Sequence, residues 1–145
     1  MEFSLHSHQR EIFEDETRFK VVAAGRRFGK SYLAAIVLYI EAAKDFKLLP
    51  TGENVDLKLE EVYYVAPTYE QGKKILWPLL KSMGDDLISK TYEQTGTVIL
   101  INGRRISIKG SDRPDSLRGV GLSYCVLDEY AFMKEEVWDV IIEPA

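Results

Sequence analysis

Residues 24–31 read Ala-Gly-Arg-Arg-Phe-Gly-Lys-Ser and stand between two apolar segments. A glycine, four further residues and then Gly-Lys-Ser/Thr, placed between a strand and a helix, is the pattern of a phosphate-binding loop. Gly29, Lys30 and Ser31 match the end of that pattern, whereas Ala24 stands at the position of its first glycine. The stretch therefore predicts a phosphate-binding loop of deviant form.

The segments on both sides of this loop have the character that its chemistry requires. Residues 18–24 predict a short buried strand, and residues 31–43 predict a helix because they are rich in Ala, Leu and Ile and contain no Gly or Pro. A helix N-terminus presents N–H groups and the positive end of the helix dipole to an anion. Lys30 would add a charge for the β- and γ-phosphates, and Ser31 would offer a hydroxyl to Mg²⁺. The alternative is a strand-to-helix turn that binds nothing.

Length and composition are those of an ordinary globular domain. The 145 residues allow one domain or part of one, with 46% hydrophobic and 29% charged residues. The formal net charge of −4 excludes a global basic field, so a DNA partner would be held by local patches. A single cysteine, Cys125, rules out a disulfide within the chain and suits a reducing compartment. The sequence shows no signal peptide and no apolar run of membrane-spanning length, so we expect a cytoplasmic protein without membrane contact.

The rest of the chain alternates strand and helix patterns. The N-terminal part predicts a first helix with Ser7 as its N-cap, a strand over 62–66 and a helix over 69–83 that Pro78 kinks or breaks. A hairpin is predicted over 97–101 and 104–108, because Asn102-Gly103 favours a tight turn between two strands. A strand over 123–127 and a helix over 135–142 follow. This order predicts an α/β sandwich with a mainly parallel central sheet. No strand pattern follows residue 142, so we expect the fold to be truncated before its last core strands.

Two acidic residues, Asp128 and Glu129, follow the strand predicted over 123–127. Open parallel sheets bind ligands at the carboxyl ends of their strands. Asp128 would hold Mg²⁺ opposite Ser31, and Glu129 would orient and polarise an attacking water. Successive side chains of a strand point to opposite faces, so the two carboxylates could both reach one ion only if the chain bent, and their placement fits two distinct roles. An acidic pair that is merely solvated is the alternative, but the phosphate-binding loop upstream favours a site.

Arginines form the next group of candidates. Arg26 and Arg27 lie inside the loop, and Arg118 lies in Ser-Leu-Arg-Gly. A site of phosphoryl transfer gains from a cation near the γ-phosphate, supplied by the same chain or by a neighbour. Arg27 in solvent or paired with an acid, and Arg118 paired with Asp112 or Asp115, are the alternatives. A basic run, formed by Arg104, Arg105, Lys109 and Arg113, is either a DNA contact or a solvated hairpin face.

Several motifs together resemble one family. They are Ala-Ala-Gly-Arg-Arg-Phe-Gly-Lys-Ser (23–31), Ser-Leu-Arg-Gly (116–119), Val-Leu-Asp-Glu-Tyr-Ala (126–131), Val-Ala-Pro-Thr (65–68) and Leu-His-Ser-His-Gln (5–9). In these motifs the chain resembles the large terminase subunits of tailed bacteriophages, which are ATP-driven motors that package DNA into a procapsid. The resemblance implies a P-loop NTPase of the ASCE type, with a three-layer sandwich, and identifies residues 1–145 as the N-terminal part of its ATPase domain. The nuclease domain of complete members would lie beyond this chain.

The resemblance also implies a role for each matched residue. Gln9 would read the adenine edge, although a surface helix glutamine is the alternative. ATP would be bound by the loop residues Gly25, Arg26, Arg27, Phe28, Gly29, Lys30 and Ser31, and Mg²⁺ by Ser31 and Asp128. Catalysis would fall to Glu129, to Arg26 as the loop arginine, and to Arg118, which some members place in a neighbouring subunit.

The implied partners are double-stranded DNA, a portal protein and a small terminase subunit. The resemblance implies a homo-oligomeric ring on the procapsid, a monomer in isolation, and a location in the cytoplasm of the bacterial host. Two other functions stay open at this point: the first motor domain of a DNA helicase or translocase, and a truncated nucleotide-binding module without turnover.

Overall fold

The computed structural model describes residues 5–16, 20, 29–44, 61–117, 122–129, 133 and 137. Its elements, in chain order, are α1 (Ser7–Glu14), α2 (Lys30–Ala43), β1 (Glu61–Ala66), α3 (Tyr69–Met83), β2 (Ile88–Tyr92), β3 (Thr97–Leu100), β4 (Arg105–Gly110), the 3-10 helix η1 (Pro114–Leu117) and β5 (Leu122–Leu127). The helices predicted at 31–43 and 69–83, the strands at 62–66 and 123–127, and the hairpin are confirmed within one or two residues at nearly every boundary. The strand predicted over 18–24, apart from Lys20, and the helix predicted over 135–142, apart from Val137, lie outside the described residues.

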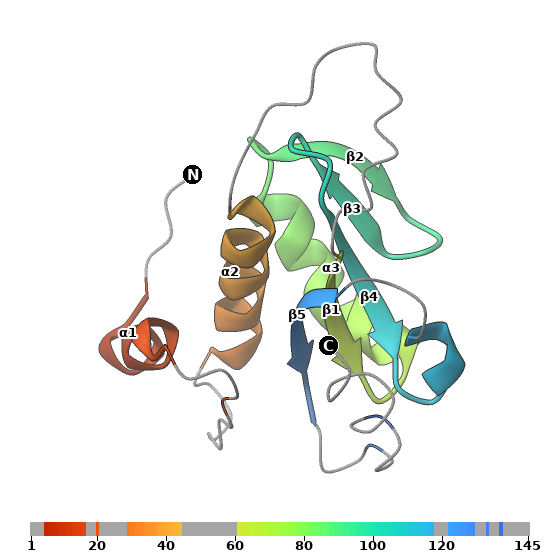
Figure 1. Ribbon diagram of the computed structural model, residues 1–145, viewed down its shortest axis with the longest axis horizontal. Coiled ribbons are helices and arrows are strands. Elements are labelled where there is room, and N and C mark those ends of the chain that lie inside the picture. The colour runs from red at the N-terminus through yellow and green to blue at the C-terminus, as the bar shows by residue number, and fades with distance from the viewer. Residues whose placement is uncertain are drawn as a thin grey trace.

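One mixed sheet organises these elements, with strand order β2-β3-β4-β1-β5 (Figure 1). Strand β1 pairs in parallel with β4 on one side and with β5 on the other, so that Tyr64 lies opposite Ile108 and Val126. Strands β3 and β2 extend the sheet in antiparallel fashion beyond β4. The expected α/β architecture is confirmed, and the described sheet is mixed, with a parallel part formed by β4, β1 and β5.

Two helices cover one face of the sheet. Helices α2 and α3 pack side by side on it, and α1 lies against the outer side of α2 (Figure 1). The core between helices and sheet contains aromatic and aliphatic side chains that are almost completely buried, among them Leu38, Tyr39, Tyr64, Leu76, Leu80, Leu100, Ile106 and Ile108. The opposite face of β1 and β5 packs against Leu117 of η1 and against Val137. Strand β1 is therefore buried on both faces, as its continuous apolar run predicts.

The turn between β3 and β4 fixes the C-terminal end of α2. Asn102 is 5% exposed; its Nδ2 donates to the Ala42 carbonyl at 2.8 Å, and its Oδ1 accepts from the Arg104 backbone N–H at 3.0 Å. Arg104 Nη1 donates to the Glu41 carbonyl at 3.2 Å. Carbonyls in the last turn of a helix have no partner within the helix, so these two side chains satisfy them and place a positive charge at the negative end of the dipole. Arg104, predicted as a DNA contact or a solvated residue, therefore caps a helix.

The same turn differs from the two-residue turn that Asn102-Gly103 favours. The Leu100 N–H donates to the Arg104 carbonyl at 2.9 Å, so three residues, 101–103, connect the strands. Gly103 has a φ of 85°, in the left-handed region that glycine adopts most readily. The extra residue lets the side chain of Asn102 reach α2 while the hairpin stays closed.

Strand β2 was not predicted, because four of its five residues are exposed and it has no apolar run. It is held through the turn that follows it. Trp77 Nε1 on α3 donates to Glu93 Oε2 at 2.7 Å, and Lys81 Nζ lies 3.0 Å from Glu93 Oε1. The hydrogen bonds from Lys81 and Trp77 lower the pKa of the Glu93 carboxyl. The edge strand thus depends on polar contacts with α3 and leaves little signal in its own sequence.

Two helix predictions need correction. The N-cap of α1 is His6 and not Ser7, because His6 Nδ1 accepts from the Gln9 N–H at 3.2 Å while Gln9 Oε1 accepts from the His6 N–H at 3.1 Å. This reciprocal pair is a capping box in which histidine takes the place of serine. Helix α3 runs through Pro78 without a break.

None of the helices in the described ranges combines the length and the apolar character needed to cross a bilayer.

Replacing Asn102 by alanine should destabilise the protein by about 1–3 kcal/mol, because the buried Ala42 carbonyl and Arg104 N–H lose their partners. Urea unfolding followed by circular dichroism measures this difference. The control is Gln94→Ala at an exposed turn position, where only the backbone carbonyl is bonded in the structure. Equal stability of the two variants would show that the α2 cap contributes nothing.

Candidate active site

The N-terminus of α2 is built for close approach of a ligand. Its N-cap is Gly29, with φ 82° and ψ 32°, and this residue has no side chain with which to cap the helix. The Gly29 carbonyl accepts the first intrahelical bond, from the Leu33 N–H at 3.0 Å. The N–H groups of the first turn have no acceptor within a helix, and they carry the positive end of the dipole. Lys30, exposed, and Ser31, half-buried, are the first two residues of this helix, as the motif requires.

Gln9 connects α1 to this same helix end. Its side chain is 4% exposed, and its Nε2 donates to the Gly29 carbonyl at 3.0 Å. Its Oε1 belongs to the capping box of α1. The alternative of a surface glutamine is therefore wrong: Gln9 is buried and anchors α1 to the N-cap of α2. Whether Gln9 also reads adenine stays a prediction.

Asp128 and Glu129 directly follow β5, and the backbone changes direction between them. The Asp128 N–H donates to the Val65 carbonyl at 2.9 Å, which extends the pairing of β5 with β1 by one residue. Glu129 then adopts a φ of 54°, in the left-handed region, and its side chain is exposed. Such a conformation costs a non-glycine residue on the order of 1–3 kcal/mol, and residues of this kind cluster at active sites. The chain therefore leaves the strand direction at Glu129, directly after Asp128.

Tyr64 is a member of the site that sequence reasoning missed. Its hydroxyl donates to Asp128 Oδ2, and its ring is completely buried in the core beneath α2 and α3. Burial raises the pKa of the Tyr64 hydroxyl, and the hydrogen bond to Asp128 and the charges of Asp128 and Glu129 raise it further, so the phenol stays protonated and donates. The sequence suggests only a core aromatic here, since the contact depends on parallel pairing of β1 with β5.

The arrangement of α2 brings both halves of the site to one edge of the sheet. The C-terminal end of α2 is bonded to the turn that begins β4. With fourteen residues, α2 is about 21 Å long, and the six residues of β4 span about 20 Å. Because α2 runs against the strand direction, its N-terminus reaches the edge at which the parallel strands end (Figure 1). Lys30 and Ser31 therefore lie at the same edge as Asp128 and Glu129.

The loops after β1 and β4 close the neighbouring part of this edge. The Ser111 N–H donates to the Ala66 carbonyl at 2.8 Å, and its Oγ lies 3.3 Å from the Pro67 carbonyl. A side chain at Gly110 would lie 2.5 Å from the Tyr69 backbone nitrogen. The Pro67 and Ser111 loops are thus packed directly on each other.

The donor chemistry of this edge fits a magnesium ion bound together with phosphates. Mg²⁺ prefers oxygen ligands and usually binds through one or two protein groups plus water and phosphate oxygens. Ser31 and Asp128 offer a hydroxyl and a carboxylate. Within the described ranges there is no group of three or more His, Cys, Asp or Glu residues able to hold a metal, so a site made of protein ligands alone is not found there.

Five residues predicted for the site, Gly25, Arg26, Arg27, Phe28 and Arg118, lie outside the described residues.

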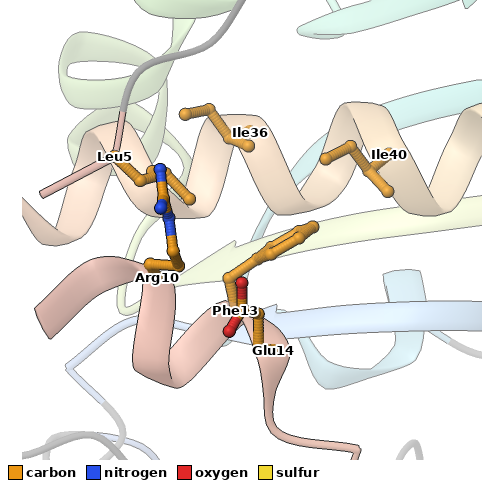
Figure 2. Close-up of a pocket in the computed structure, with 6 residues that line it drawn as sticks. All are labelled: Leu5, Arg10, Phe13, Glu14, Ile36 and Ile40. Atoms are coloured by element: carbon orange, nitrogen blue, oxygen red, sulfur yellow. The ribbon is translucent and has the colours of Figure 1, made fainter. Parts of the chain in front are cut away.

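A hollow of about 270 Å³ lies between α1 and α2, away from the residues discussed so far (Figure 2). It is lined by Leu5, Arg10, Phe13, Glu14, Ile36 and Ile40. Phe13 extends from α1 toward α2, where Ile36 and Ile40 line the opposite wall (Figure 2). The lining contains neither Lys30 nor Asp128, so this hollow is a gap in the packing of α1 on α2 and not the phosphate site.

Comparison with known proteins agrees with this geometry. The profile of the family described as terminase large subunit, T4likevirus-type, N-terminal, matches residues 21–138. The chain belongs to this family. Membership decides against the helicase reading, which the motifs alone had left open.

Two curated relatives are terminase large subunits of phages. The chain is 25% identical over 161 residues to that of Thermus phage G20c and 24% identical over 163 residues to that of Thermus virus P23-45. Each match covers 96% of this chain but 30% of the relative, so the chain spans less than a third of their length.

The fold is similar to a solved structure, the large terminase ATPase domain of Thermus phage P74-26. The TM-score is 0.74 at 22% identity, and the match covers 98% of this chain and 60% of that chain. The described sheet and helices therefore have the architecture of a terminase ATPase domain.

Gly29→Ala should destabilise the protein by about 1–3 kcal/mol, because alanine is strained at this φ and its Cβ would lie 2.4 Å from Gln9 Nε2. Urea unfolding of the single variants and of the double variant with Gln9→Ala forms a mutant cycle. Shortening Gln9 removes the clash but not the backbone strain, so the cost of Gly29→Ala should fall in the Gln9→Ala background. An unchanged cost would mean that Gln9 does not confine Gly29.

Proposed function

We propose that this chain is the ATP-hydrolysing part of a phage DNA-packaging motor, with a P-loop fold of the ASCE type in three layers. The proposal rests on one observation. The start of α2, with Lys30 and Ser31, lies at the same edge of the sheet as Asp128 and Glu129, which directly follow β5. Membership of the terminase large-subunit family supports the same function.

In this proposal ATP binds with its phosphates at the N-terminus of α2. The first-turn N–H groups, with loop residues Gly25 to Gly29, surround the phosphates, and Lys30 contributes its charge to the β- and γ-phosphates. Ser31 and Asp128 hold Mg²⁺. The ion, when bound, neutralises charge that develops on the transferred phosphoryl group.

Hydrolysis is assigned to Glu129 and to the arginines. The Glu129 carboxylate orients the attacking water and accepts its proton. The water oxygen forms a bond to the γ-phosphorus while the bond from that phosphorus to the β,γ-bridging oxygen breaks, so that ADP and inorganic phosphate are released. Arg26 compensates negative charge from within the loop. Arg118 reaches the site of a neighbouring subunit in a homo-oligomeric ring, and a guanidinium suits that role because it stays charged and donates to two oxygens at once.

Gln9 is proposed to read adenine in addition to anchoring α1. A glutamine amide nitrogen carries two hydrogens, and its oxygen accepts two bonds. In the structure the amide nitrogen donates to the Gly29 carbonyl and the amide oxygen accepts from the His6 N–H. A Gln9 side chain that contacts adenine would then connect the base directly to Gly29, the N-cap of α2.

The proposed partners follow from the family. They are double-stranded DNA, a portal protein and a small terminase subunit, in the cytoplasm of an infected bacterium, with this chain monomeric on its own. With a net charge of −4, contact with DNA would have to be local.

Lys30→Ala should weaken ATP·Mg²⁺ binding roughly 10- to 100-fold, the range expected for loss of a charged hydrogen bond. Isothermal titration calorimetry measures the affinity. Lys44→Ala is the matched control, because Lys44 lies at the other end of the same helix and pairs with Glu41. Equal binding by wild type and Lys30→Ala would overturn the phosphate-site assignment.

Glu129→Gln should leave ATP binding within about twofold and lower turnover roughly 10²- to 10⁴-fold, the contribution typical of a general base. Phosphate release is measured in the presence of double-stranded DNA and the partner subunits. Glu70→Gln serves as control, since Glu70 is exposed in the first turn of α3, directly after β1. Turnover of Glu129→Gln close to wild type would exclude Glu129 as the base.

A further inference from the structure

Tyr64 occupies a position from which it controls the end of the neighbouring strand. It lies on β1, and its register partner on β5 is Val126, two residues before Asp128. On the face that α2 and α3 cover, its ring is completely buried, and its hydroxyl reaches Asp128 Oδ2. An aromatic ring packed into the core thus carries its single polar atom to the carboxylate proposed to bind Mg²⁺.

The surroundings of the ring fix its position. A Cβ at Gly72 on α3 would lie 3.6 Å from Tyr64 Cε1 and 2.9 Å from Ile108 Cγ2, so α3 and the sheet are in direct contact beside the ring. Val62 and Ala66, the adjacent β1 residues on the same face, are buried with it. Because the ring is packed on several sides, its position is fixed, and the Asp128 side chain takes the orientation that lets its carboxylate accept the hydroxyl proton.

Two hydrogen bonds with β1 fix the position of Asp128. Its backbone N–H is bonded to Val65 and its side chain to Tyr64, so one strand, β1, holds both ends of the residue. The carboxylate is half-exposed and follows the last residue of β5, directly before the left-handed turn at Glu129. A carboxylate offers about four lone-pair sites on two oxygens. Accepting one O–H therefore leaves it able to bind a cation.

We propose that Tyr64 is a positioning residue for the metal site: its hydroxyl holds the Asp128 carboxylate in the orientation that binds Mg²⁺ together with ATP. The inference rests on the proposed function. Groups that orient a metal ligand in this way typically contribute 10- to 100-fold to metal affinity or activity. A purely structural role would require only that the buried hydroxyl have an acceptor.

The test compares Tyr64→Phe with Tyr39→Phe. Tyr39 is also completely buried in the same core, but its hydroxyl donates to the Leu80 carbonyl, in the interior of α3. Both variants lose one buried phenolic hydrogen bond, so both should be less stable in urea unfolding. Only Tyr64→Phe should bind Mn²⁺ about 10- to 100-fold more weakly in the presence of a non-hydrolysable ATP analogue, as measured by electron paramagnetic resonance.

Asp128→Asn completes a double-mutant cycle for the same measurement. Adding Tyr64→Phe to Asp128→Asn should cause no further loss of Mn²⁺ affinity, because Tyr64 acts only through that carboxylate. Mn²⁺ affinity of Tyr64→Phe within twofold of wild type, or equal losses for Tyr64→Phe and Tyr39→Phe, would overturn the positioning role. Failure of the wild-type protein to bind the analogue at all would instead overturn the proposed function.

Discussion

Strand β1 is hydrogen-bonded in parallel to β4 on one side and to β5 on the other, and the candidate site depends on this pairing. Parallel strands end at a common edge, so three loops that are far apart in sequence start from neighbouring points. The loop after β1 packs on the loop after β4 through Ser111, and Asp128 is bonded to Val65. The burial of β1 on both faces stabilises this alignment, because a shift by one residue would move its tyrosines and valines to the wrong faces.

Helix α2 must also be placed along its axis, and side chains at both ends do this. Asn102 and Arg104 bond to the carbonyls of its last turn, and Gln9 bonds to Gly29 at its N-cap. These bonds come from opposite ends of the molecule and act on a helix of about 21 Å. Helix α2 is thus held at both of its ends, by α1 at its N-terminus and by the hairpin at its C-terminus.

The sequence predicted the elements whose signal is local. Helix α2 and strand β1 are apolar runs, and the hairpin is marked by Asn102-Gly103. Strand β2 was missed because Ile88 is its one residue that is not exposed, and the turn after it is held by polar contacts of Glu93 with α3. The cap of α1 was placed one residue late because histidine is an unusual capping residue, and its partner Gln9 had been considered as a ligand for adenine or as a surface glutamine, not as part of a cap.

The candidate site divides in the same way. Lys30, Ser31, Asp128 and Glu129 could be chosen as candidates from the sequence, because phosphate chemistry restricts both residue type and spacing. The contact of Tyr64 with Asp128 could not be predicted from the sequence. The neighbours Tyr63 and Val65 indicate a buried strand, but they do not show whether the Tyr64 hydroxyl bonds to a carboxylate. Its role appears only when the register of β1 against β5 is known, as this register sets the distance from Tyr64 to Asp128.

The adjacent acids that follow β5 illustrate how one backbone change gives two neighbouring carboxylates different surroundings. Asp128 keeps the strand direction, stays bonded to β1 through main chain and side chain, and is half-buried. Glu129 leaves the strand through a left-handed φ and is exposed. A metal ligand needs a fixed orientation, whereas a base that activates water needs access to solvent. The left-handed φ at Glu129, which costs on the order of 1–3 kcal/mol, turns the chain out of the strand directly after Asp128 and leaves the second carboxylate exposed.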